Sequence, residues 1–198
     1  MRKVSLGIKI VFIALIPLLA FFILALINLN TALDKSNLAG VIQKKVQLFE
    51  LSSKVIHQTQ RERAISIMFI NGTAASSDLT TQRNQTNEMI TPFKAELKAS
   101  YVDQTERENG LSAIESLMKL RESVDSKLLS APETAKKYSE IISIYLQSEI
   151  RMAKASKLEE IPSMLLTQTI FEVAKESGGR LRAHILAILG ADKPSNFS

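Results

Sequence analysis

The sequence predicts an all-α protein in which an N-terminal transmembrane helix leads into an antiparallel helical bundle. Composition is the first reason: the 198 residues are 45% hydrophobic and 23% charged, with only seven Gly and five Pro. Helical proteins with a packed core have such a composition. The second reason is that apolar residues after residue 30 recur every three or four positions, and no alternating strand pattern persists. The third is a long uncharged segment near the N-terminus.

That segment runs from Ile10 to Ile27 and contains 18 residues without a charge. Its length just spans the hydrocarbon core of a bilayer, and Pro17 is tolerated inside such a helix. A cleaved signal peptide is the alternative. Because the apolar run exceeds the usual core of such peptides, about 7–15 residues, and no clear small-residue cleavage site follows, we expect an uncleaved signal anchor.

The expected topology follows from basic residues that precede the segment, Arg2, Lys3 and Lys9. Positive charge is retained on the cytoplasmic side of a membrane. We therefore expect residues 1–9 in the cytoplasm, residues 10–29 as a single span of the inner (cytoplasmic) membrane, and residues 30–198 as an extracytoplasmic helical domain in the periplasm.

Five helices are expected after the anchor, covering about residues 30–70, 77–100, 111–129, 132–157 and 162–189. Asn71-Gly72 is a suitable end for the first, because Gly accepts the left-handed conformation after a helix. Ser130 to Glu133 is a helix-start signal with Pro132 in the first turn. The polar stretch YVDQTERENG, residues 101–110, is expected to be a connector. Sequential helices with short links favour an antiparallel bundle.

Several classes of chemistry are excluded or disfavoured by the residue inventory. There is no cysteine, so neither a disulfide nor a thiolate site exists, and the two histidines, His57 and His184, form no HExxH motif. No paired-carboxylate cleft, nucleophile elbow or phosphate loop is evident. We expect no enzymatic activity, no cofactor and no metal. The net charge of +5 is not gathered into a stripe, which disfavours nucleic-acid binding.

Charged side chains occupy positions where a bundle helix normally carries Leu. Phe49, Ile56, Arg63 and Ile70 follow one another at sevenfold spacing, so Arg63 takes a core position. Gln60 lies beside it. We call such a set of core positions along one helix a core row, and polar residues interrupt the core rows of the later helices too. In the second helix, Arg83 and Thr86 lie among Leu79, Ile90, Phe93 and Leu97. In the third, Arg121 lies among Ile114, Met118 and Leu128, and in the fourth, Glu149 lies among Tyr138, Ile142, Tyr145 and Met152.

A buried arginine requires an anionic partner, since an unpaired buried charge is very costly. The partner could be internal: Arg121 could pair with Glu149, and Arg63 with Glu62, Glu172 or Glu176. Arginine stems can also carry the charge to the bundle edge. The other possibility is a small anion, because the rigid fork of guanidinium donors suits planar oxyanions.

The fifth expected helix contains KESGGRLRAHILAIL, residues 175–189. Gly178 and Gly179 precede Arg182 by four and three residues, hence lie on the same helix face, and each costs about 1 kcal/mol relative to Ala inside a helix. Missing side chains there would open a space beside the guanidinium. A helix break or close helix packing at Gly-Gly is the alternative.

Four segments resemble the nitrate- and nitrite-sensing domain family. HQTQRERAISIMFI resembles that family's HxxQxERG-x-S segment, and QRNQTNEMI resembles its QRxxTD segment. LRESVDS followed by KKYSEIISIYL resembles its R-x-x-VD and Y-[ST]-x-x-I helices, and KESGGRLRAHIL its second E-x-x-G-x-ER-A segment. The segments occur in the family's order and cover about residues 50–189. Three positions depart from the pattern: Ala64 for Gly, Asn87 for Asp and Leu181 for Glu.

The resemblance implies an all-helical module of two packed bundles that binds nitrate or nitrite through arginines near their interface. By position, Arg63 and Arg182 are the ligand candidates, while Arg61 and Arg180 are expected to point elsewhere. Arg83 is a lesser candidate from its row position, and Gln60, Gly178 and Gly179 are expected to support the site.

The resemblance also implies a membrane-bound bacterial sensory receptor, such as a chemoreceptor, with residues 30–198 as its incomplete sensing domain. Family members continue beyond DKPSNFS with more helices, a second span and a cytoplasmic signalling module, so we expect a fragment of a longer, homodimeric receptor or a truncated reading frame. Anion binding would shift helices and relay that shift across the membrane. The alternative is a non-sensing stalk or dimerisation module whose row charges pair internally.

Overall fold

The computed structural model describes residues 6–155 and 160–191, and every element in these ranges is an α-helix: α1 Leu6–Ile70, α2 Ser76–Glu96, α3 Gln104–Asp125, α4 Ala131–Ala155 and α5 Glu160–Ala191. The predicted all-α fold class is confirmed. The chain divides into two compact units, Met1–Lys44 and Lys45–Ser198, which are described separately.

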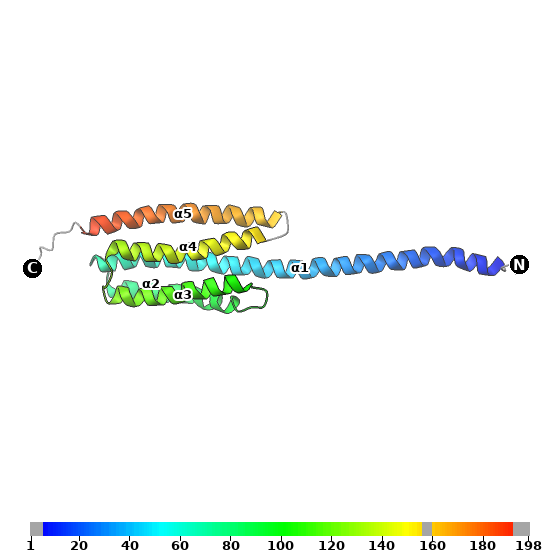
Figure 1. The fold of residues 1–198 in the computed structure, drawn as a ribbon, viewed down its shortest axis with the longest axis horizontal. Helices are drawn as coiled ribbons and strands as arrows, with labels where there is room; N and C mark the ends of the chain where they lie inside the picture. Colours follow the sequence, from blue (N-terminus) through cyan, green and yellow to red (C-terminus); the bar gives the residue numbers. More distant parts are fainter. Residues whose placement is uncertain (1–5, 156–159, 192–198) are drawn as a thin grey trace, which may run out of the picture. The chain divides into compact units, whose positions relative to one another are not determined.

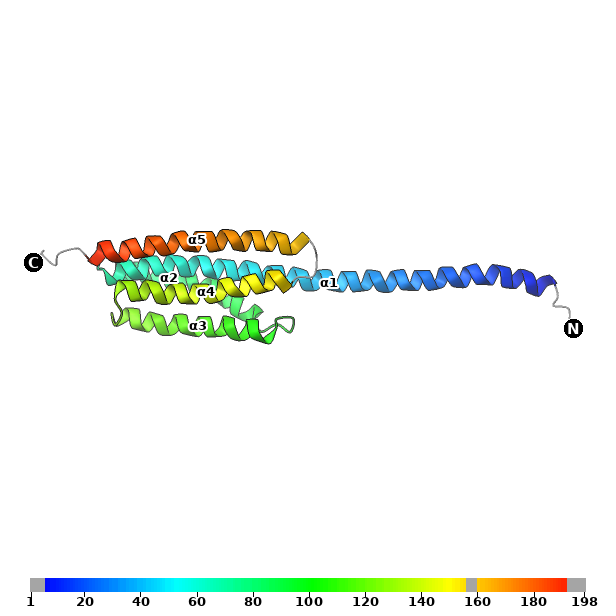
Figure 2. The ribbon, with the colours of Figure 1, turned by 45° about the horizontal axis from the view of Figure 1, so that its top comes forward.

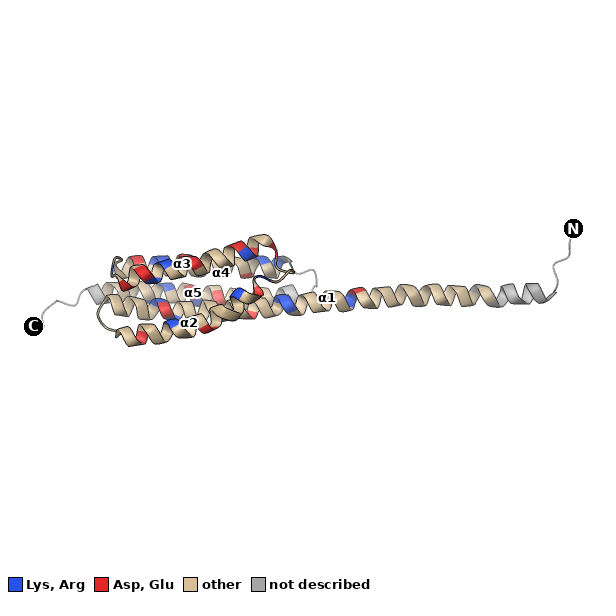
Figure 3. Cartoon of the chain, turned by 90° about the horizontal axis from the view of Figure 1, so that it is seen from below, with Lys and Arg blue, Asp and Glu red and all other residues tan. Residues whose placement is uncertain are grey.

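The first unit carries the apolar part of α1. Among the described helices, α1 alone is long and apolar enough to cross a membrane, judged by length and composition, with a mean hydropathy of 1.7 over its most apolar window. Its side chains there are exposed, including Phe21 and Phe22, and Figure 3 shows almost no charge along this stretch. A helix with an exposed apolar surface on all sides fits an apolar solvent better than water, although signal sequences share these properties.

The second unit is built on a four-helix arrangement of α1 (from Lys45), α2, α3 and α4 (Figure 1). Their facing residues form one continuous core, which includes Val55, Ile56, Phe93, Leu117 and Tyr145. The rings of Phe93 and Tyr145 meet edge to face, with centroids 5.8 Å apart, a preferred aromatic geometry. The rows predicted from heptad spacing therefore do face inward, apart from Leu128, which follows the end of α3 and is exposed.

Helix α5 lies against α4 and α1 on the side away from α3 (Figure 2). Small residues allow the close approach at one end, where Ala183 and Ala187 pack against Ala131 and Ala135 of α4. At the other end, Leu165 packs against Phe49 of α1. The opposite face of α5 exposes apolar side chains, among them Ile170, Phe171, Leu181, Ile185, Ile188 and Leu189.

Two helix boundaries follow the predicted signals. After α1, Gly72 adopts φ +70°, and the backbone N–H groups of Gly72 and Thr73 donate to Phe69 and Met68, so the predicted end at Asn71-Gly72 is confirmed. Before α4, the backbone N–H of Ser130 donates to the Glu133 carboxylate at 2.8 Å and that of Glu133 to the Ser130 hydroxyl at 3.4 Å, a reciprocal cap.

The structure corrects the predicted connector at residues 101–110 and excludes the helix break considered at Gly178-Gly179. The stretch 101–110 is not a connector throughout, because α3 begins at Gln104, where the Asp103 carboxylate accepts the Glu106 backbone N–H at 2.9 Å. Arg107 also donates to the carbonyls of Leu97, Ala99 and Val102. The Gly178-Gly179 pair does not break α5, which runs uninterrupted through both residues.

Candidate anion-binding site

A pocket of about 350 Å³ lies between α1 and α5. From α1 it is lined by residues spread over about two turns, and from α5 by residues spread over about three turns. The lining residues are His57, Gln60, Arg61, Arg63, Ala64, Lys175, Gly178, Gly179, Arg182, Ala183 and Leu186. The structure thus brings Arg63, Arg182, Gln60 and both glycines together, as predicted.

Arg63 has an internal anionic partner, which is Glu176 of α5. Its Nη1 donates to Glu176 Oε1 at 2.6 Å and its Nη2 to Glu176 Oε2 at 3.2 Å, while Nη1 also donates to the Ser139 hydroxyl of α4 at 2.8 Å. Both residues of the pair are 2% exposed. Gln60 and Arg180 donate to the same carboxylate at 2.9 and 3.0 Å. Of the internal partners considered from the sequence, Glu176 is the one that binds Arg63.

The pair still leaves donors for a ligand. A guanidinium has five N–H groups, and the described contacts of Arg63 use three of them. Gly179 lies directly over the group: a Cβ there would stand 2.7 Å from Arg63 Nη2, whereas a Cβ at Gly178 would meet nothing within 4 Å. The two glycines therefore differ in the space around them. Only at Gly179 does the position of the Arg63 guanidinium leave no room for a side chain.

Two of the remaining lining cations, Arg61 and Arg182, have no carboxylate partner in the described part of the chain. Neither Arg61 nor Arg182 forms an ion pair with a described residue, whereas Lys175 binds Glu172 at 2.9 Å. None of the described lining residues is acidic. With Arg63 paired to Glu176 and Lys175 to Glu172, the pocket keeps an excess of positive charge from Arg61 and Arg182.

The expectation that Arg61 and Arg180 point elsewhere holds for only one of them. Arg180 lines a different groove, between α4 and α5, together with His184. Arg61 lines the same pocket as Arg63 and Arg182, so its prediction was wrong. Residues 61 and 63 lie about 200° apart around a helix, but Arg61, although exposed, also lines the pocket.

His57 completes the polar lining and remains neutral near pH 7. Burial, together with the positive charges of Lys175 and Arg61, lowers the pKa of His57 below its usual 6.5, while Glu172 opposes that shift. A neutral imidazole can donate one hydrogen bond into the pocket. Protonation at acid pH would add another positive charge to the site.

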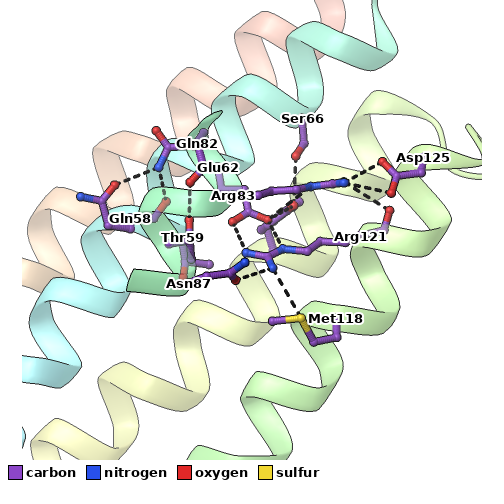
Figure 4. A network of polar contacts seen from close by, with 12 residues as sticks. Gln58, Thr59, Glu62, Ser66, Gln82, Arg83, Asn87, Met118, Arg121 and Asp125 are labelled. Atoms are coloured by element: carbon purple, nitrogen blue, oxygen red, sulfur yellow. Dashed lines mark hydrogen bonds and ion pairs between the residues drawn. The ribbon is translucent and has the colours of Figure 1, made fainter. Parts of the chain in front are cut away.

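A second group of buried charges joins α1, α2 and α3 away from this pocket (Figure 4). Glu62 is fully buried and accepts two hydrogen bonds from Arg121, each 2.7 Å, and one from the Tyr138 hydroxyl at 3.0 Å. Arg121 also donates to the Asn87 amide oxygen at 2.7 Å. The predicted pair of Arg121 with Glu149 was therefore wrong: Glu62, from the same turn as Arg63, is the partner.

Arg83 belongs to this second group and does not line the α1–α5 pocket. Its Nη1 binds both carboxylate oxygens of Asp125, at 2.7 and 2.9 Å, and its Nη2 donates to the Arg121 carbonyl. Two cations and two carboxylates balance one another here, so the group acts as an internal clamp. The lesser candidate Arg83 is thus placed apart from Arg63 and Arg182.

Three polar residues that line the pocket were not predicted as site residues from the sequence: His57, Arg61 and Lys175. A signal for them was present. Lys175 and Arg182 are seven residues apart and share a face of α5 with Gly178, and His57 and Arg61 are four apart on α1. These residues lie beside the core rows, on the surfaces by which α1 and α5 face each other.

Comparison with known proteins identifies the family of the chain. The model of one protein family, described as nitrate and nitrite sensing, matches residues 54–197. No curated protein matches the chain, and no solved structure does. The match covers most of the 198 residues and includes every residue that lines the α1–α5 pocket. The chain belongs to the nitrate- and nitrite-sensing domain family.

Proposed function

We propose that this sensing domain binds nitrate or nitrite in the α1–α5 pocket, with Arg182 and Arg63 as its principal ligands. The observation that supports this most strongly is the excess of cationic side chains around a pocket with no acidic lining residue. Charge-assisted hydrogen bonds from guanidinium groups to oxyanions are short and directional. Arg61 and Lys175 add positive charge at the same place.

In this proposal the two principal arginines have different roles. Arg63 is fixed by Glu176 and Ser139, so its unused N–H groups form a rigid wall, and Gly179 leaves room beside it. Arg182 is exposed and has no described carboxylate partner, so it can move onto the anion. A planar ion between them would join α1 to α5 by bonds that neither helix makes without it.

The output of such binding would be a change in the position of α5 against α1. Displacements of about 1–2 Å at helix interfaces are sufficient in known switches, and a ligand favours whichever arrangement it binds more tightly. We propose that α1, which also carries the apolar segment, is anchored in the inner membrane with the bundle in the periplasm. A homodimer would then pass the shift to a cytoplasmic signalling module outside this sequence.

Isothermal titration of the full chain in detergent micelles, with a series of sodium salts, tests the ligand. Nitrate and nitrite should release or absorb heat at micromolar to millimolar concentration, and sulfate and chloride should do so only weakly, because the fork of guanidinium donors matches a small planar oxyanion. No heat and no rise in melting temperature with nitrate, in a folded sample, would contradict the proposal.

A stalk or dimerisation module is the second candidate function. It is favoured by the internal pairing of Arg63 with Glu176 and Arg121 with Glu62. It is also favoured by exposed apolar side chains on α5 at coiled-coil spacing: Phe171, Ala174, Leu181, Ile185 and Ile188. Sedimentation of the full chain with Leu181→Glu distinguishes the two. If the variant loses a dimer that nitrate does not affect, and nitrate gives no heat, dimerisation alone explains the module.

A further inference from the structure

Glu149 of α4 is a buried carboxyl group that forms no ion pair with a described residue, and the Ser52 hydroxyl is the one polar group near it that favours its charged form by hydrogen bonding. Its side chain is fully buried, and neither carboxylate oxygen has a partner at ordinary hydrogen-bond geometry among the described residues. The arginine expected for it, Arg121, binds Glu62 instead. Buried acids almost always have such a partner, so this exception requires an explanation.

The neighbours of Glu149 connect it to the anion pocket. Ser52 of α1 and Glu172 and Lys175 of α5 are close enough to alter its ionisation. Glu172 accepts a hydrogen bond from the Ser53 hydroxyl at 3.3 Å and from the Lys175 ammonium at 3.1 Å. Lys175 in turn lines the pocket with Arg63 and Arg182. Two carboxyl groups and one cation thus link α4, α5 and the pocket.

Burial makes the charged form of Glu149 unfavourable. It raises the pKa of Glu149 from 4.5 to about 8, with the Glu172 charge adding to the rise, while the Ser52 hydroxyl and Lys175 oppose it. The folded protein therefore holds a proton on Glu149 at neutral pH, which the unfolded chain releases above its ordinary pKa.

We propose that Glu149, with Glu172 beside it, is a proton-binding site coupled to the anion pocket, so that anion binding and proton binding strengthen each other. This coupling rests on the proposed function of the pocket, but the proton site itself does not. No ligand other than a proton is needed, because a buried carboxyl group avoids the cost of its charge by holding one.

Lys175 is the physical link between the two sites. When Glu149 is neutral, Glu172 is the one carboxylate of the cluster that draws on the Lys175 ammonium, and the pocket keeps more of its positive potential. Ionisation of Glu149 adds negative charge inside the bundle and lowers that potential. Because coupling between two binding equilibria is reciprocal, an anion in the pocket must make Glu149 harder to ionise by the same factor.

The titration of Glu149 can be distinguished from that of the other described groups around Glu149 and Glu172. Helix α1 presents Ser52 and Ser53 and, one turn later, His57; α5 presents Glu172 and Lys175. The pKa of His57 is lowered, so His57 is mostly neutral from pH 6.5 to 9, and its remaining titration is common to wild type and Glu149→Gln. Glu149→Gln keeps the size of the side chain and removes its titration.

The proton site is tested first without any anion. For the full chain in detergent micelles, the melting temperature should fall by about 5 °C between pH 6.5 and 9, because the folded state binds the proton more tightly than the unfolded state. Glu149→Gln should abolish most of that fall, whereas Glu115→Gln, at an exposed position of α3, should retain it. An equal fall in wild type and Glu149→Gln would overturn the proton site.

The coupling is tested by nitrate titration over the same pH range. The dissociation constant should rise about 5-fold from pH 6.5 to 9 in wild type and less than about 2-fold in Glu149→Gln. Near pH 8, heats measured in two buffers of different ionisation enthalpy should show proton uptake on nitrate binding. A pH-independent affinity, or the same pH dependence in Glu149→Gln, would overturn the coupling.

The two sets of measurements separate the proposals. If nitrate does not bind at any pH, both the proposed function and the coupling fail, and the melting experiment still decides whether Glu149 holds a proton. If nitrate binds with no proton uptake, the function stands and the coupling is wrong.

Discussion

The guanidinium of Arg63 and the carboxylate of Glu176 form a buried two-point ion pair that joins α1 to α5, with Nη1 and Oε1 2.6 Å apart. The pair satisfies the charge that the sequence places in the core without any external ligand. It also orients Arg63 at the wall of the pocket. The site is therefore prepared before an anion arrives, which lowers the cost of binding.

Removal of the Glu176 side chain should show how much the Arg63–Glu176 pair contributes to the stability of the fold. Glu176→Ala leaves Arg63 buried without its anion, a change that typically costs about 3–5 kcal/mol of unfolding free energy, measurable by urea denaturation. Nitrate or formate should restore more stability to this variant than to wild type, because a small anion can enter the space of the lost carboxylate. Equal effects of nitrate on the two proteins would show that the pocket and the pair are not connected.

The two adjacent glycines of α5 provide a matched comparison. Gly178→Ala should stabilise the protein by up to about 1 kcal/mol, since Ala favours a helix and no atom lies within 4 Å of the added Cβ. Gly179→Ala should weaken nitrate binding at least about 10-fold, because Cβ would lie 2.7 Å from Arg63 Nη2 and the ion pair restrains that group from moving away. Thermal melts and nitrate titrations check both. Equal nitrate affinities in the two variants would contradict the placement of Arg63.

Arg121 should matter for folding and not for anion recognition. Arg121→Leu leaves Glu62 fully buried without its two strongest hydrogen bonds, so we expect a loss of about 3–5 kcal/mol in unfolding free energy. Lys119→Leu, at an exposed position of the same helix, should leave the urea midpoint unchanged. At a temperature where Arg121→Leu remains folded, its nitrate affinity should match that of wild type, and a selective loss of binding would place Arg121 in the site.

The start of α3 depends on one carboxylate. Asp103→Ala should cost about 1 kcal/mol, because the Glu106 backbone N–H loses its acceptor. Asp103→Asn should cost much less, since an amide oxygen can accept the same hydrogen bond. Urea denaturation of both variants tests the cap, and equal losses would mean that the charge rather than the hydrogen bond stabilises the helix start.

Much of the fold could be predicted from the sequence because helix periodicity and end signals are local. Ile56, Arg63, Ile142 and Tyr145 follow from spacing alone, and Gly72 from its conformational freedom. The start of α3 could not be predicted in this way. Its signal, Asp103, lies within a polar stretch, and the stabilising contacts of Arg107 come from carbonyls across the preceding turn.

The partners of buried charges were harder to predict, because pairing depends on which helices are adjacent and at what height. Arg121 and Glu149 both lie on core rows, but Glu62 is the carboxylate that reaches Arg121. Glu149 faces Ser52 and Glu172 instead. Spacing along one helix shows that a side chain points inward; it does not show what it meets there.

The most direct test of the central claim is nitrate titration of the full chain with Arg182→Gln and Arg180→Gln. Arg182 lines the α1–α5 pocket and Arg180 lines the groove between α4 and α5, although they are two residues apart on one helix. Loss of one charge-assisted contact costs about 1.5–3 kcal/mol, or roughly 10- to 100-fold in affinity. We expect that loss for Arg182→Gln and less than about 2-fold for Arg180→Gln. Unchanged nitrate affinity in Arg182→Gln would contradict the account.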